Sequence, residues 1–290
     1  MKLNLLDYKE LKSYPSGSGI EFHDDKIYLV GDDAKDILVM SRKWKDEQLI
    51  NIFDSPQERI PKKIKADLEA TAIVHLDTMV YLLIMGSGST DQRNKGIMLN
   101  VETGDKTEID CTLFYKRLKE NGIIDLNIEG ATEVSDYMIF CNRGNKTHPA
   151  NELIVTNKDF FRNQQNAPIG LLNIDMSEYE GTMAISGACY SYEHDWLIFT
   201  ASTEDTADSY HDGTIGKSYL GIIEDAYRKI TKNRVRVNEL IDLAKTNKKF
   251  DGFKIESVCI QSERKYRMKL HLVADNDDGK SHLFKILLRF

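Results

Sequence analysis

The sequence has few cysteines and no long apolar run, and both absences narrow the classes of protein to which it can belong. Its four cysteines, among 290 residues, are widely separated and form no Cys-x-x-Cys motif. A disulfide-rich secreted domain or a clustered zinc site would need a different cysteine pattern. No apolar stretch approaches the roughly 18 residues of a membrane-spanning helix. We therefore expect no membrane association.

Basic residues are also fewer than acidic ones. The chain has 39 Lys and Arg against 46 Asp and Glu, a net charge of −7. Nucleic acids select a basic surface, so we expect no nucleic-acid partner, whereas a bound cation is compatible with this balance. The N-terminal segment lacks the apolar core and cleavage site of a signal peptide, and scattered cysteines are typical of a reducing compartment. The expected location is cytoplasmic, or secreted if a leader was removed.

Short strand-like runs are abundant, and five of them repeat one pattern. An aliphatic residue is followed by a polar one, a short strand, a turn and a more apolar strand. The five pairs are Ile20-Glu21, Leu68-Glu69, Ile128-Glu129, Ile185-Ser186 and Ile255-Glu256. Their polar members recur at intervals of 48, 60, 57 and 70 residues, with two further strand-like runs between successive pairs. Four strands in roughly 40 to 60 residues are typical of a β-propeller blade.

The two ends of the chain complement each other in this pattern. The last repeat ends one strand short at residues 281–290, and residues 3–11 have the pattern of the missing outer strand. The sequence therefore predicts an all-β, five-bladed β-propeller, with four antiparallel strands per blade and an N-terminal strand that closes the last blade. The alternative is two unrelated domains resembling β-sandwiches. The blades of a single domain spanning 1–290 are expected at approximately 12–55, 64–115, 124–176, 181–243, and 252–290 with 3–11.

The polar members of the five pairs form the first candidate site. The first strand of a blade lies nearest the axis, so a ring is expected from Glu21, Glu69, Glu129, Ser186 and Glu256. Crowded carboxylates repel each other, and protonation, a central cation or a water-filled channel would each relieve the repulsion. A five-way set of oxygen donors suits Ca²⁺, and Mg²⁺ is also possible. Cys189 and Cys259, three residues past their anchors, are interpreted as small packing side chains.

Charged residues are expected around this ring at the same end of the axis. The second strand of each blade returns to the rim where the first begins, which brings Asp32 and Asp33 near the ring. Lys65, Arg93 and Arg143 are expected at the same rim. Because Lys and Arg beside a divalent ion bind phosphate or carboxylate groups, we interpret these three as candidate anion-binding residues. Asp32 or Asp33 is the candidate general base.

Several short motifs resemble one enzyme family. They are "SGIEF", "KIYLVGDD", "KADLEA", "LLIMGSGS", "IEGA", "IFCNRGN" and "KIESV", and they are similar to segments of the calcium-activated nucleotidase (apyrase) family. The resemblance implies a five-bladed propeller with an axial calcium held by Glu and Ser side chains, and hydrolysis of nucleoside di- and triphosphates. The Glu-anchored pattern also resembles uncharacterised bacterial propellers of the phytase-like and gluconolactonase-like kinds. Aromatic-rich segments that would hold a nucleobase are missing.

Two functions remain open from the sequence. The first is a metal-dependent hydrolase of a phosphorylated small molecule, related to nucleotidases. The second is a non-catalytic propeller with a structural axial cation, whose polar rim binds a ligand or a protein partner. A small anionic ligand is compatible with both, and a monomer or weak oligomer is expected.

Overall fold

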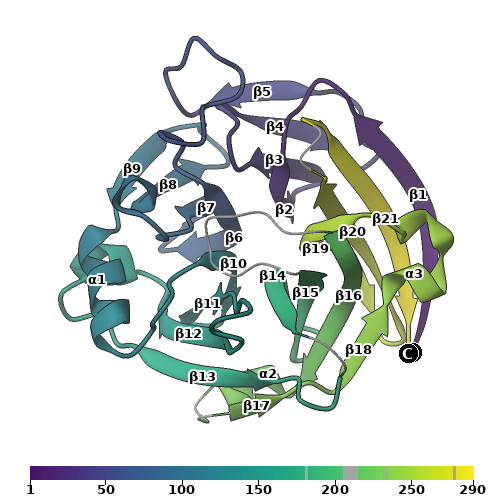
Figure 1. Ribbon diagram of the computed structural model, residues 1–290. Coiled ribbons are helices and arrows are strands. Elements are labelled where there is room, and N and C mark those ends of the chain that lie inside the picture. Colours follow the sequence, from purple (N-terminus) through teal and green to yellow (C-terminus); the bar gives the residue numbers. More distant parts are fainter. Residues whose placement is uncertain (180–181, 205–214, 231, 233, 277–278) are drawn as a thin grey trace.

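Five β-sheets stand around a central axis in the computed structural model, and each is one blade of a propeller (Figure 1). The structure describes residues 1–290 except 180–181, 205–214, 231, 233 and 277–278. The inner strands of neighbouring blades pack against one another around the axis. The predicted all-β, five-bladed propeller is confirmed.

The strands of each blade follow one another outward from the axis. Blade 1 contains β2 (Gly17–His23), β3 (Lys26–Gly31), β4 (Asp36–Ser41) and β5 (Gln48–Asn51). Blade 2 contains β6 (Leu68–Leu76), β7 (Met79–Gly86), β8 (Lys95–Asn100) and β9 (Lys106–Asp110). Blade 3 contains β10 (Ile128–Val134), β11 (Tyr137–Asn142), β12 (Asn151–Asn157) and β13 (Gly170–Asp175), with β17 (Arg234–Arg236) added in parallel. Blade 4 contains β14 (Met183–Ser191), β15 (Trp196–Glu204), β16 (Ile215–Glu224) and β18 (Glu239–Asp242).

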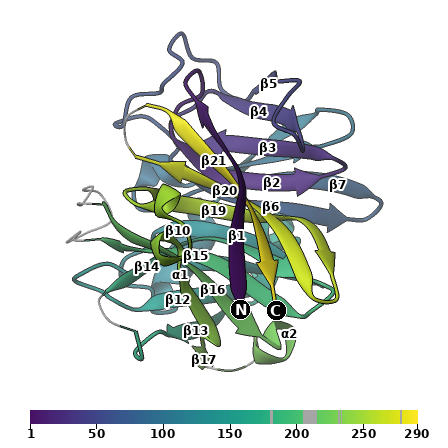
Figure 2. The ribbon, with the colours of Figure 1, turned by 90° about the vertical axis from the view of Figure 1, so that its right-hand side faces the viewer.

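Blade 5 joins the two ends of the chain. Its strands are β19 (Lys254–Arg264), β20 (Arg267–Asp275), β21 (Ser281–Arg289) and β1 (Lys2–Leu11). β1 pairs antiparallel with β21 from Lys2 opposite Arg289 to Leu11 opposite Ser281. Figure 2 shows the two termini beside each other at one end of this blade. The predicted closure by the N-terminal strand is confirmed, and it leaves blade 5 with four strands.

Helices are few and short in the part of the chain that the structure describes. They are α1 (Thr112–Glu120), α2 (Ala226–Lys229) and α3 (Leu243–Thr246), with 3₁₀ turns η1 (Asp91–Arg93), η2 (Phe160–Asn163) and η3 (Lys248–Phe250). The longest, α1, inserts Phe114, Tyr115 and Leu118 into the apolar layer between blades 2 and 3. Within the described residues, we find no helix with the length and apolar character that crossing a membrane requires.

One apolar cluster fills each gap between neighbouring blades. Strand β7 shows how the sequence supplies two of them at once. Leu82 and Ile84 face blade 1, whereas Leu83 and Met85 face blade 3. Because successive strand residues point to opposite faces, a strand buried on both sides needs a continuous apolar run rather than an alternating one.

The inner strands approach each other closely at one level of the axis. A Cβ atom added to Gly130 would lie 2.4 Å from the main-chain oxygen of Ser186 in the next blade. One added to Gly187 would lie 2.5 Å from the Cα of Ser257. Small residues are therefore required there, and the axis is packed rather than wide at this level.

This close approach gives a first stability prediction. We expect Gly130→Ala to lower the free energy of unfolding by about 2–3 kcal/mol, because main-chain atoms of blade 4 must move. Gly170→Ala is the matched control, since its Cβ would meet Val155 at an ordinary 3.6 Å. Urea denaturation of both variants measures the difference. Equal stability of the two would contradict the close approach of blades 3 and 4.

Candidate functional site

The first strand of every blade contains a β-bulge, and these bulges define which residues are equivalent around the axis. The residues in the bulges are Ser18, Glu69, Glu129, Ser186 and Glu256. Four of the five predicted ring members therefore occupy equivalent positions. The prediction for blade 1 is wrong, because Ser18 takes the bulge position and Glu21 lies three residues further along β2.

The register of the strands explains this correction. Gly17 pairs with Gly31 and Gly19 with Val30, which leaves Ser18 as the extra residue. Glu21 is consequently level with Ala72, Thr132, Cys189 and Cys259. At about 3.3 Å per strand residue, it lies roughly 10 Å along the axis from the bulge ring.

The two serines of the ring connect neighbouring blades. Ser18 Oγ donates to the main-chain oxygen of Leu68 at 2.5 Å, and Ser186 Oγ donates to that of Ile255 at 3.0 Å. Each hydroxyl thus joins its own inner strand to the next one. Both side chains are buried and already have protein partners.

Two of the three glutamates of the ring have cationic partners from their own blades. Arg143 Nη1 lies 3.3 Å from Glu129 Oε2, and Asn127 donates to the other oxygen of Glu129 at 2.6 Å. Lys254 Nζ lies 2.9 Å from Glu256 Oε1. These pairs relieve the repulsion in a way that the sequence argument did not consider. Arg143, predicted to bind a ligand anion, faces Glu129.

Carboxylates converge at one side of the ring, where blades 1 and 2 meet. Asp32 follows β3, Asp67 precedes β6, and Glu69 is the bulge residue of β6. Each offers an oxygen, and these oxygens lie within 4.8 Å of one another. We call these three residues the acidic triad. It contains one predicted metal ligand, one predicted base, and Asp67, which the sequence argument missed.

Two cations hold the acidic triad together. Lys65 Nζ pairs with Asp32 and lies 2.8 Å from Asp67 Oδ1. Arg93 Nη1 lies 2.6 Å from Asp67 Oδ2, to which Ser87 Oγ also donates. The predicted anion-binding residues Lys65 and Arg93 are thus brought to the triad. With three carboxylates and two cations, the fully ionised group has a charge of −1.

Burial and mutual repulsion shift the acid–base properties of the triad. Burial, together with Asp33 and Asp67, raises the pKa of Asp32 to about 7, although Lys65 opposes the shift. Burial first, and then the charges of Glu129, Asp67 and Asp32, raise the pKa of Glu69 well above its ordinary range. Burial lowers the pKa of Lys65, but the surrounding carboxylates outweigh it and raise that pKa overall. Lys65 therefore stays charged.

Asp33 has a different environment from its neighbour Asp32. Arg59 Nε donates to Asp33 Oδ2 at 2.8 Å, and Arg59 Nη2 donates to Ser16 Oγ at 3.1 Å. The other oxygen of Asp33 is buried and has no partner among the described residues. Of the two predicted bases, Asp33 belongs to an ion pair and Asp32 to the acidic triad.

A basic pocket of about 280 Å³ adjoins the acidic triad. It is lined by Lys62, Lys63, Lys65, Thr90, Gln92 and Arg93. Lys65 and Arg93 belong to both features, so the pocket places positive charge directly beside the carboxylates. We call it the basic pocket.

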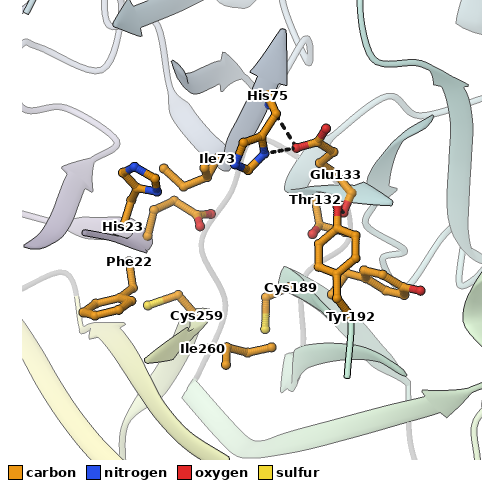
Figure 3. Close-up of a pocket in the computed structure, with 12 residues that line it drawn as sticks. Phe22, His23, Ile73, His75, Thr132, Glu133, Cys189, Tyr192, Cys259 and Ile260 are labelled. Carbon is orange, nitrogen blue, oxygen red and sulfur yellow. Dashed lines mark hydrogen bonds and ion pairs between the residues drawn. The ribbon is translucent and has the colours of Figure 1, made fainter. Parts of the chain in front are cut away.

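A second pocket, of about 190 Å³, lies around the axis toward the other ends of the inner strands (Figure 3). We call it the axial pocket. His75 and Glu133 meet at its edge, where the Nδ1 of His75 lies 2.7 Å from Glu133 Oε2. Glu21, Cys189 and Cys259 also line it. Glu21, Cys189 and Cys259 were singled out from the sequence, whereas His75 and Glu133 were not. The alternation of side chains along β6 and β10 is the signal that could have located them.

A family model described as "Family of unknown function (DUF6929)" matches residues 13–288. No curated protein matches the sequence.

Solved structures with related folds include two enzymes. Myxococcus xanthus glutaminyl cyclase has a TM-score of 0.56 and 10% identity, covering 99% of this chain and 97% of its own. The GH43 β-1,3-galactosidase BT3683, solved with galactodeoxynojirimycin, has a TM-score of 0.53 and 8% identity, covering 93% of this chain and 90% of its own. At these identities the likeness concerns the fold alone, and neither structure is specific to apyrases.

Proposed function

The chain belongs to the DUF6929 family, and we propose from its own side chains that it binds a small phosphate- or carboxylate-bearing ligand together with a divalent cation. The proposal rests on one observation. The oxygens of Asp32, Asp67 and Glu69 converge beside a basic pocket that shares Lys65 and Arg93 with them. Adjacent cation- and anion-binding groups suit a ligand that is itself bound through a metal ion.

The donor atoms of the acidic triad fit a hard cation. Both oxygens of Asp67 and one of Asp32 already accept bonds from Lys65 or Arg93. Asp32 Oδ1 is buried without a partner among the described residues, and no hydrogen bond joins Glu69 to a described side chain. Asp32 and Glu69 would therefore hold the ion. Two carboxylates leave room for waters and ligand oxygens, which favours Mg²⁺, whereas Ca²⁺ would need more oxygens from water or ligand.

The finer proposal is hydrolysis of a phosphorylated small molecule. A bound divalent ion would supply Lewis-acid stabilisation of phosphoryl oxygens. Lys65 and Arg93 would bind the same oxygens and neutralise their charge. Asp32 is the better candidate for the base, because its pKa of about 7 suits proton transfer and Asp33 is paired with Arg59. If Asp32 is the base, Glu69 is the main protein ligand of the ion.

A second candidate function is binding without catalysis. Glu129 and Glu256 are neutralised by Arg143 and Lys254. The negative charge of these two carboxylates is therefore balanced by side chains of the protein itself, as expected if the axis has a structural role. In this case the ion and the basic pocket would retain a ligand or a partner without turning it over.

Ion binding is tested by calorimetric titration of the protein with CaCl₂ and MgCl₂. We expect Glu69→Gln to weaken the affinity for the ion by at least about tenfold, since it removes a charged ligand. The matched control is Glu256→Gln, which changes the equivalent bulge residue of blade 5 and should leave the ion affinity unchanged. An equal loss in both variants would instead support the five-membered ring expected from the sequence. If neither ion binds and EDTA leaves the melting temperature unchanged, the proposal is wrong.

Catalysis is tested by phosphate release from ATP, ADP, GDP and simple phosphate esters with each ion. A hydrolase should release phosphate, and Asp32→Asn should abolish most of that release because the amide cannot accept the proton. Absence of turnover with saturable binding of the same compounds would favour the non-catalytic function.

A further inference from the structure

The axial pocket is separate from the acidic triad and is built by all five blades. Strand β2 contributes Glu21, Phe22 and His23, and β6 contributes Ile73 and His75. The other inner strands contribute Thr132 and Glu133 from β10, Cys189 and Tyr190 from β14, and Cys259 and Ile260 from β19, and Tyr192 lies just beyond β14. Side chains from separate blades point toward a common space in Figure 3. The triad lies where the inner strands begin, whereas this pocket lies where they end.

A carboxyl group without a cationic partner lines this pocket. Glu21 is only 8% exposed, and the hydroxyl of Thr71 donates to its Oε1 at 3.1 Å. No described Lys, Arg or His forms an ion pair with it. Burial keeps the proton on this unpaired carboxyl to a higher pH than usual. A positively charged ligand group beside Glu21 would take the place of that proton.

The other charged groups around the pocket do not fill that place. Among the twelve described residues that line it, none is Lys or Arg. His75 is engaged by Glu133 through both its ring Nδ1 and its main-chain N–H. Burial and the neighbouring His75 lower the pKa of His23, which favours the neutral form of its ring. An anionic ligand would therefore find little to bind.

Part of the pocket wall is apolar and aromatic. Phe22, Ile73 and Ile260 contribute hydrocarbon surface. The rings of Tyr190 and Tyr192 meet edge to face with centroids 4.8 Å apart, and Tyr192 is 59% exposed. Aromatic faces attract organic cations as well as apolar groups. Such walls suit a ligand with a hydrocarbon body and one positive charge.

The two cysteines do not turn this pocket into a metal or thiolate site. Burial, and then the charge of Glu21, raise the pKa of both Cys189 and Cys259 well above the ordinary range, so both remain thiols. Among the described residues, the acidic triad is the group of three possible ligand atoms close enough to hold a metal ion. An organic cation fits the chemistry of the axial pocket better than a metal ion does.

We propose that the axial pocket binds a small primary ammonium compound with a hydrocarbon or aromatic body, and that Glu21 is the counter-ion of its ammonium group. The body of the ligand packs between Phe22, Ile73 and Tyr192. The ammonium group donates to the carboxylate of Glu21. This site is independent of the ion and anion site proposed above.

Benzylammonium chloride and its neutral analogue benzyl alcohol are the probes for this pocket. Their binding to the full-length protein is measured by calorimetry and by ligand-observed NMR. We expect saturable binding of the amine and at least about tenfold weaker binding of the alcohol, because only the amine pairs with Glu21. Glu21→Gln should weaken the binding of the amine to about that of the alcohol. Asp24→Asn, which removes an exposed carboxylate three residues away, is the matched control and should change neither affinity.

A second variant keeps the test decisive if Glu21→Gln does not fold. Tyr192→Ala removes an exposed ring and should weaken benzylammonium several-fold through lost ring contact. The proposal is wrong if amine and alcohol bind equally, if neither saturates at millimolar concentration, or if both pocket variants bind the amine as the unaltered protein does.

Discussion

Glu21→Gln is expected to make the protein more stable than the unaltered chain at pH 9, by about 4 kcal/mol, and no more stable at pH 4. Burial raises the pKa of Glu21 from 4.5 to about 8, although the Thr71 hydroxyl favours the ionised form. The folded protein therefore holds this proton to a higher pH than the unfolded chain does. Its contribution to stability is fully present below pH 4.5 and is lost as the pH rises to about 8.

The amide of Gln explains the direction of this effect. It has the shape of the protonated carboxyl, can still accept from Thr71, and cannot ionise. Urea denaturation of both proteins from pH 4 to pH 9 measures the difference in unfolding free energy. The other titratable groups that line the pocket are the same in both proteins: His23, His75, Glu133, Cys189, Tyr190, Tyr192 and Cys259. Their contributions largely cancel in the difference.

Parallel stability curves for the two proteins would contradict the buried, unpaired state of Glu21. Asp24→Asn, which changes an exposed carboxylate in the turn after β2, serves as the control. At pH 9, a saturating ammonium ligand should raise the free energy of unfolding of the unaltered protein toward that of Glu21→Gln. This links the stability experiment to the ligand proposed for the axial pocket.

The repeat was predictable from the sequence, but its alignment in blade 1 was not fully recognised. The pattern of an aliphatic residue followed by a polar one is met in blade 1 by Ile20-Glu21. The physical requirement is different: a bulge residue followed by a small residue, because the next inner strand comes very close. Ser18-Gly19 matches Ser186-Gly187 and Glu129-Gly130 in this respect. Requiring a small residue after the anchor would have placed Ser18 in the ring.

The ion pairs of the ring were only partly accessible from sequence. Lys254 and Glu256 are two residues apart on one strand, and such side chains lie on the same face, so their pairing could have been inferred. Arg143 reaches Glu129 from the following strand, which depends on the strand register and on side-chain conformation. Asp67 could not be singled out from the sequence, because it lies before β6 and outside the repeated residue pairs. It becomes part of a site only where blades 1 and 2 meet.

Helix α1 shows the limit of strand patterns. Within the run "TEIDCTLF", which has the composition of a strand, β9 ends at Asp110 and the helix begins at Thr112. Asp110 Oδ1 accepts from the main-chain N–H of Thr112 at 2.9 Å, which stabilises the first turn. Phe114 and Leu118 are four residues apart and face the same apolar layer. That helical spacing was the available signal, and short apolar runs obscured it.

Removal of the lysine within the acidic triad is expected to have a second large effect. Lys65→Met should lower the free energy of unfolding by about 3–5 kcal/mol at pH 8, because breaking a buried ion pair leaves uncompensated charge. The side chain of Lys65 is 10% exposed and pairs with both Asp32 and Asp67. Without it, three carboxylates share Arg93. Met retains most of the length and apolar volume, so the loss reports charge rather than packing.

The condition dependence of that loss tests the ion site itself. At pH 5.5 the loss should be smaller, because Asp32 and Glu69 have raised pKa values and take up protons when the cation is removed. Mg²⁺ or Ca²⁺ at pH 8 should restore stability to Lys65→Met more than it stabilises the unaltered protein, since an ion that binds only the folded state adds its binding free energy. Lys63→Met, an exposed change in the same segment, is the control and should shift stability by no more than about 0.5 kcal/mol. A loss equal at both pH values, with no rescue by either ion, would show that the triad is a closed structural network and not a cation site.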